Sequence, residues 1–372
     1  MQAEDVLSAY IEDYFEAVAS LSYSDLERRQ QGFHASLAYG AAGIAFACWY
    51  AGRVLGDPGL LDEAERWMRS AAGRQRRRLA FLVPQAKLRQ RPSSQFLFGR
   101  AGLSFVQVLV AHSRRDRRAQ TSALSRFAEL ARLSKGGSPE LYNGTGGCLI
   151  GVAFLFREVR EPRLRNLGDE LAANLISRAA QAEEGLILWP ELRGLGASHG
   201  SAGAYLSLLL WAVASGSALP EWFASSLESL LAAAVRNPQK LCPSEAFHSC
   251  LCNGFSGLVY LGAKACQVLG GEGLLGAAAA AARYALENLT DQPDLCCGRA
   301  GVAFSCLALA RVDSRGAWRQ HAQKLALSTL LCEREEWTYA GLYGGEAAIP
   351  CLALNLTTGI DGGPPCLDLL DL

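Results

Sequence analysis

The sequence lacks the features that direct a chain into or across a membrane. None of its apolar runs reaches the roughly 18 uncharged residues that a membrane-spanning helix needs, although the segment from Leu274 to Ala282 is rich in alanine. The first twenty residues are acidic and amphipathic, which is unlike a signal peptide. We therefore expect no membrane span and a cytoplasmic location.

The chain also lacks an excess of either charge and has few signals for β-strands. Its 36 basic and 36 acidic side chains balance within 372 residues, so the composition predicts no nucleic acid partner. Hydrophobic residues make up 50% of the chain, which is too apolar for a disordered protein and sufficient for a large core.

Cysteine, by contrast, is abundant, with 12 residues. Thiols stay free in a reducing cytosol, so this number favours a metal site. Cysteines in apolar runs, such as Cys48 and Cys306, are more typical of small core residues. The adjacent Cys296 and Cys297 come directly before a glycine. These two cysteines could be core residues, a redox pair or metal ligands. The redox pair is disfavoured because a disulfide between adjacent cysteines would form a strained ring.

A repeated glycine motif divides the chain into seven units. Its leading glycines are Gly40, Gly99, Gly144, Gly200, Gly254, Gly298 and Gly345. A second glycine usually follows three residues later and an apolar segment of helical length comes next; in the last unit Ala348 replaces the second glycine. The spacing of 44 to 59 residues between leading glycines fits two helices and two loops.

The segments between the glycine units are amphipathic, with apolar residues at intervals of three and four. Examples begin at Asp57, Glu161 and Pro220. This alternation predicts an inner ring of apolar helices and an outer ring with one charged face. An open superhelix would need polar terminal repeats, and the end units are as apolar as the others. We predict an all-α fold, an α/α toroid of seven helix pairs that forms a single domain over residues 1–372.

The residues that precede the glycines are expected to share one rim of this toroid, because each glycine would begin an inner helix. Side chains that can bind a metal are concentrated in units four, five and six of this rim. They include Cys252, Cys296 and Cys297. A catalytic zinc site keeps three protein ligands and an open fourth position. We therefore predict that these three thiols bind zinc, with buried core cysteines as the alternative.

His199 lies on the same predicted rim and is one of five histidines in the chain. A single histidine is more often structural than catalytic. Its position directly before a glycine turn and beside the predicted zinc site nevertheless favours a role in proton transfer.

Three motifs in this order resemble those of the lanthionine synthetase C-like cyclases: SHGSAG from Ser198, CLCNGFSG from Cys250 and LCCGRAG from Leu295. The resemblance extends from His34 to Leu356. It implies an α/α toroid with zinc at one end of a central cavity. It also implies an enzyme that adds cysteine thiols of a dehydrated precursor peptide to dehydroalanine or dehydrobutyrine and so closes thioether rings.

The resemblance assigns roles to individual residues. Cys252 and Cys296 match zinc cysteines of the family, and His199 matches its acid–base histidine. Cys297 stands where most members have a histidine, which is similar to a three-cysteine subgroup of bifunctional lanthipeptide synthetases. With three thiolates the zinc would be more electron-rich and ring closure faster.

Two further positions depart from the family pattern. Glu140 stands where the family usually has an aspartate, and His248 where it usually has an arginine. We take both as candidate catalytic residues beside His199, with Glu140 as a possible orienting partner of that histidine. Cys250 and His248 are alternative zinc ligands because they stand close to Cys252 in the sequence.

Other functions remain open for such a fold. A glycosidase-like enzyme would need two carboxylates across the cavity, and a catalytically silent toroid would bind a peptide or glutathione. For the cyclase, the partner is the precursor peptide. Because the predicted toroid leaves no room for a dehydratase domain, we expect dehydration by a separate enzyme or domain.

Overall fold

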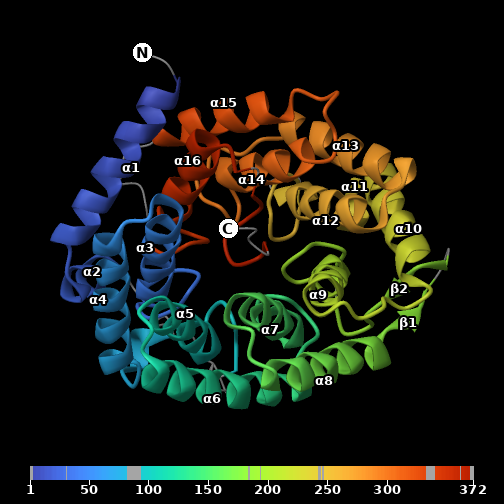
Figure 1. The fold of residues 1–372 in the computed structure, drawn as a ribbon. Coiled ribbons are helices and arrows are strands. Elements are labelled where there is room, and N and C mark those ends of the chain that lie inside the picture. The colour runs from blue at the N-terminus through green and yellow to red at the C-terminus, as the bar shows by residue number, and fades with distance from the viewer. Residues whose placement is uncertain are drawn as a thin grey trace.

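A computed structural model describes residues 3–30, 32–81, 94–182, 185–192, 194–241, 244, 247–331, 340–360 and 362–368. These residues form two concentric rings of helices (Figure 1). The strands within these ranges are β1 (Ala180–Gln181) and β2 (Ile187–Leu188), which pair antiparallel. The predicted all-α toroid is confirmed.

The inner ring contains helices that are apolar on nearly every side, as a helix surrounded by others must be. Each begins near one of the repeated glycines. They are α3 (Ala41–Leu55), α5 (Arg100–Ser113), α7 (Thr145–Val159), α9 (Ser201–Ser215), α12 (Phe255–Leu269), α14 (Arg299–Ala310) and α16 (Ala348–Thr358).

The leading glycine is the N-cap residue of the first six inner helices. Close approach of the backbone explains why glycine is needed there. A Cβ atom at Gly200 would lie 2.4 Å from the Gly196 nitrogen, and one at Gly254 would lie 2.3 Å from the His248 oxygen. No side chain fits these spaces without moving the backbone.

The seventh inner helix departs from the predicted pattern. Helix α16 has Ala347 as its N-cap and begins at Ala348, two residues later than a helix with Gly345 as its N-cap would begin. Pro350 explains the delay, because proline lacks an N–H group and is tolerated only in the first turn of a helix. A helix that began directly after Gly345 would place Pro350 in its second turn.

The outer ring contains amphipathic helices that turn their polar faces outward. Helix α1 packs against α16 and α15, so the start of the chain covers the last inner helix and closes the ring (Figure 1). The outer elements are α1 (Ala3–Ser20), α2 (Tyr23–Arg29), α4 (Pro58–Arg74), α6 (Arg117–Leu133), α8 (Arg163–Arg178), α10 (Phe223–Arg236), α13 (Glu272–Glu287) and α15 (Trp318–Leu330). Short turns are η1 (Arg78–Ala80), η2 (Ser134–Gly136) and α11 (Pro238–Leu241).

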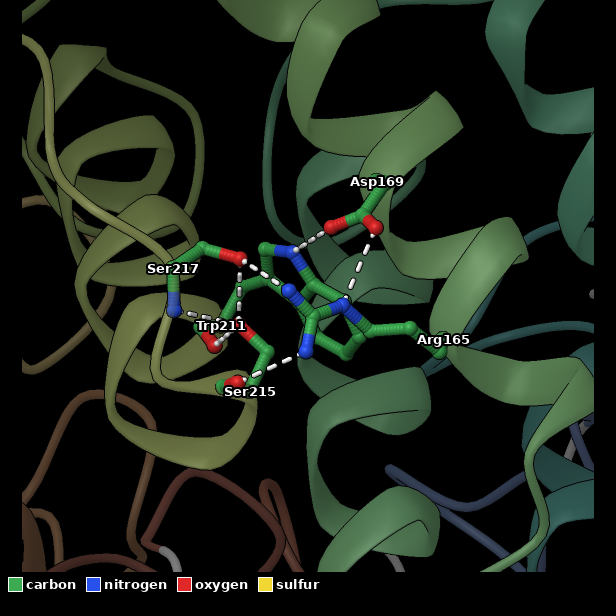
Figure 2. Close-up of polar contacts among 5 residues, drawn as sticks. All are labelled: Arg165, Asp169, Trp211, Ser215 and Ser217. Carbon is green, nitrogen blue, oxygen red and sulfur yellow. Dashed lines mark hydrogen bonds and ion pairs between the residues drawn. The ribbon is translucent and has the colours of Figure 1, made fainter.

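Arg165 on α8 ties the outer ring to the end of inner helix α9 (Figure 2). Its guanidinium donates to the main-chain oxygen of Ser215 at 2.8 Å and to the hydroxyl of Ser217 at 3.0 Å. Asp169 accepts hydrogen bonds from Arg165 and from the indole of Trp211. A cation at the C-terminal end of a helix is also favoured by the helix dipole.

Residues 362–368 enter the centre of the ring (Figure 1). The Tyr260 hydroxyl donates to the Leu367 oxygen at 2.6 Å, and Tyr343 donates to Pro365 at 3.3 Å. Asp368 is only 2% exposed and forms ion pairs with Lys264 and Arg311.

Every helix in the described part of the chain is too short or too polar to cross a membrane.

Replacing Lys264 by methionine is expected to lower the free energy of unfolding by about 3 kcal/mol or more, because one partner of a buried ion pair is lost while the other stays charged. The remaining cation, Arg311, is 3.8 Å from Asp368. Urea unfolding of both proteins measures the difference. The same exchange at Lys324, which is exposed on α15, is the control and should change stability little; equal effects at both positions would contradict this role of Lys264.

Candidate metal centre

A series of main-chain hydrogen bonds joins the seven glycine turns at one end of the toroid. Its members are the residues two positions before each leading glycine. Six bonds of 2.6 to 3.3 Å follow the order of the repeats and link the last repeat back to the first. They run from Ala38 to Leu97, Tyr142 to Ser198, Ser198 to Cys252, Cys252 to Cys296, Cys296 to Tyr343 and Tyr343 to Ala38, donor first. The turns therefore share one rim.

Three thiols form a tight cluster on this rim. The sulfur atoms of Cys250, Cys252 and Cys297 all lie within 4.8 Å of one another. The Cys252 and Cys297 sulfurs are 3.6 Å apart. Two of the three predicted ligands are thus in the cluster, and its third member is Cys250, which the sequence suggested only as an alternative.

Cys296, the remaining predicted ligand, lies beside the cluster. Its sulfur is 3.1 Å from the hydroxyl of Tyr142, and only 7% of the residue is exposed. Hydrogen bonding with the Cys252 and Cys297 thiols, together with burial, raises the pKa of Cys296. Cys296 therefore lies next to Tyr142 at the edge of the cluster and is not among the three described thiols whose sulfurs are all within 4.8 Å of one another.

Local hydrogen bonds hold Cys297 in place. Its N–H donates to the Asp294 carboxylate at 2.8 Å, and its carbonyl accepts from Thr290 at 2.8 Å. Burial raises the pKa of Asp294 to about 6. Both partners precede the double cysteine in the same loop, so the loop itself directs the Cys297 sulfur toward Cys252.

The electrostatics of the four thiols suit a cation. Hydrogen bonds from the other three sulfurs hold the pKa of Cys297 far below its ordinary value, while the contact with Cys250 raises the pKa of Cys252. Soft sulfur donors at this spacing fit Zn²⁺, which is bound by thiolates in tetrahedral sites.

His199 and Glu140 form a pair next to the thiols. The Nδ1 atom of His199 is 2.9 Å from Oε2 of Glu140, and the imidazole packs edge-on against Tyr142. His199 is also close enough to Cys297 to lower the pKa of that thiol electrostatically, after the stronger hydrogen bonds from the other sulfurs. A carboxylate that accepts from Nδ1–H leaves Nε2 to accept or donate a proton. His199 is exposed, with 44% of its side chain accessible.

His248 is buried beneath the turn that carries Cys252. Its Nδ1 atom is 3.0 Å from the hydroxyl of Tyr284 on α13, and its main-chain oxygen accepts from the N–H of Phe255 at 2.6 Å. The ring also packs against Phe255. These contacts connect the turn to inner helix α12 and outer helix α13.

Aromatic rings extend from the thiols along the rim. Phe33, Tyr39 and Phe98 pack on one another with ring centroids 5.1 to 5.5 Å apart, and Phe98 continues to Tyr142 at 5.5 Å. We call these four residues the aromatic wall. Burial and then Cys296 raise the pKa of Tyr39, which places this residue near the thiols. Phe33 has a φ of 56°, a strained value for a bulky residue that often marks functional sites.

Sequence reasoning assigned no role to the aromatic wall or to the contact between Tyr142 and Cys296. The sequence did contain a signal for the position of these aromatic residues on the rim, because Tyr39 and Phe98 directly precede their glycines just as His199 and Cys297 do. The direction of each side chain depends on the turn geometry, which the sequence did not reveal.

Comparisons with known proteins agree with this architecture. A family model described as lanthionine synthetase C-like protein matches residues 33–360. The solved structure of nisin cyclase is similar to this chain with a TM-score of 0.67, over 96% of this chain and 94% of that one, at 12% sequence identity. This low identity shows a shared fold alone, and no curated protein matches the sequence. Because the family model covers most of the chain, the protein belongs to the lanthionine synthetase C-like family.

Proposed function

We propose that this protein is a zinc-dependent lanthipeptide cyclase. It would add cysteine thiols of a dehydrated precursor peptide to dehydroalanine or dehydrobutyrine and form thioether rings. The observation that carries this proposal is the cluster of thiols beside an exposed histidine–carboxylate pair on one rim. Thiol addition to an alkene needs a site for sulfur and a group that moves a proton, and this rim offers both.

The metal would be held by Cys252, Cys296 and Cys297. When bound, zinc supplies Lewis acidity that favours the thiolate form of an incoming substrate thiol. Tyr142 would donate its hydroxyl hydrogen to the Cys296 sulfur, since the two atoms are 3.1 Å apart. Such outer partners orient a metal ligand and adjust how strongly it donates.

His199 would move the proton that the addition requires. The new bond joins the substrate sulfur to the β-carbon, the π bond breaks, and the thiol proton ends on the α-carbon. Nε2 of His199 would accept the proton and return it, while Glu140 orients the ring and stabilises its charged form. No group leaves, so the mass of the peptide stays constant.

His248 would act as a positioning residue. Its imidazole contacts Tyr284 and is only 2% exposed, which supports a role in holding the turn of Cys252 rather than direct contact with substrate. The aromatic wall would offer the peptide an apolar surface beside the thiols. Dehydration of the precursor would occur in a separate enzyme or domain.

The function is tested by incubating the full chain with a dehydrated peptide that contains one cysteine and one dehydroalanine. We expect the peptide to lose its free thiol, measured by alkylation, with no change in mass. A catalytically silent protein would leave the thiol free, and, when glutathione is included in the mixture, addition of glutathione to the dehydroalanine would increase the mass. Either result would overturn the cyclase proposal.

Replacing Cys297 by histidine is expected to retain zinc and slow cyclisation by several-fold. The exchange replaces a thiolate ligand by a neutral nitrogen ligand and so removes one negative charge from the metal site. A substrate sulfur bound there would then be less nucleophilic. Zinc content and single-turnover rates with the same peptide measure both effects. An unchanged rate would contradict the importance of the third thiolate.

A further inference from the structure

Cys250 is a buried thiol that the mechanism above does not use. None of its surface is exposed, yet its sulfur lies within 4.8 Å of the sulfurs of Cys252 and Cys297. A cysteine that served only to fill the core would need no such neighbours, and apolar side chains would pack there equally well.

The backbone explains why two side chains of one short turn face the same point. The Cys250 N–H donates to the Phe247 oxygen at 3.1 Å, and its own carbonyl accepts from Gly254 at 3.0 Å. The Cys252 N–H donates to Cys296 in the next turn at 3.2 Å. The turn is therefore closed on itself and joined to the neighbouring turn, and both sulfurs lie close to Cys297.

The proposed ligands Cys252, Cys296 and Cys297 and the clustered Cys250 together bring four sulfurs to one part of the rim. Zinc with four cysteine ligands is coordinatively closed, whereas a zinc with three protein ligands keeps one position for a substrate. The geometry accordingly raises the question of how a substrate thiol would gain access.

We propose that Cys250 is the fourth zinc ligand of the resting protein and that the substrate thiol takes its place. This inference rests on the proposed function. In the exchange, the substrate sulfur would take the place of the Cys250 sulfur, and the proton of the substrate thiol would pass to Cys250, so that no net charge is gained or lost. The neutral Cys250 thiol then donates to the Cys297 carbonyl, which is 3.3 Å from its sulfur.

The direct test is X-ray absorption at the zinc edge on the zinc-loaded full chain. We expect four sulfur neighbours in the parent protein, three sulfurs and one lighter atom in Cys250→Ser, and four sulfurs in Cys266→Ser. Cys266 is a half-buried residue at the far end of α12 and is a matched control. Three sulfurs in the parent protein, or an unchanged count in Cys250→Ser, would overturn the proposal.

A second measurement follows Cys250 itself. A cysteine peptide without a dehydrated residue should increase alkylation of Cys250, measured by mass spectrometry, because the exchanged thiol is no longer bound to the metal. Alkylation that stays constant would also overturn the proposal. Failure of the proposed function is distinguishable, since it would appear as a parent protein that binds no zinc at all.

Discussion

Alanine at position 252 is expected to remove bound zinc and cyclisation together. The Cys252 sulfur is 3.6 Å from that of Cys297 and belongs to the tight cluster. Loss of an outer partner of a metal ligand already weakens binding by about 10- to 100-fold, so loss of the ligand itself should cost more. Zinc content after dialysis and the cyclisation rate are the measurements.

The fold of this variant should persist, because Cys252 joins the rim through its backbone. Its N–H donates to Cys296 and its oxygen accepts from Ser198 at 2.6 Å, and neither bond involves the side chain. Circular dichroism should therefore be unchanged. Alanine at Cys266 is the control and should keep zinc and activity. Full zinc occupancy in Cys252→Ala would contradict the assignment of this ligand.

Asparagine at position 199 is expected to lower turnover by about 100- to 10,000-fold, the usual contribution of general acid–base catalysis. Zinc content should not change, since the imidazole pairs with Glu140. Asparagine keeps the polarity of the site but does not exchange a proton near neutral pH. Single-turnover cyclisation with the dehydrated peptide measures the loss.

Replacing Glu140 by glutamine tests separately the two contributions of Glu140 to His199, namely holding the imidazole in its orientation and placing a negative charge beside it. Glutamine keeps an oxygen that accepts from Nδ1–H of His199 but removes the negative charge beside the ring. We expect a smaller loss of turnover than in His199→Asn, because the ring keeps its hydrogen-bonded orientation and loses only the neighbouring negative charge. Turnover of His199→Asn at the parent rate would contradict the proton-transfer role.

The inner ring could be predicted because its signals are local. A glycine directly before an apolar run marks the start of each of the first six inner helices. The seventh helix was misplaced because Pro350 delays its start. Long-range features were not predictable: helix α1 packs against α16, and residues 362–368 enter the centre of the ring. Neither segment contains the repeated motif that allowed the other units to be compared.

The candidate site shows the same division. Comparing the residues before each glycine predicted a shared rim with Cys252, Cys296, Cys297 and His199, because equivalent residues of a repeated turn take equivalent places. It did not predict that Cys250 would join the tight cluster or that Tyr142 would contact Cys296. Those contacts depend on the direction of side chains within each turn, which the spacing of glycines does not determine.

The central claim, that cyclisation depends on zinc held by the rim thiols, is tested most directly by removing and restoring the metal. The full chain is stripped with a chelator, and ring closure of the dehydrated peptide is followed by loss of its free thiol. We expect no catalysed closure in the stripped protein and full recovery on adding one equivalent of zinc. Undiminished cyclisation by metal-free protein would contradict the account.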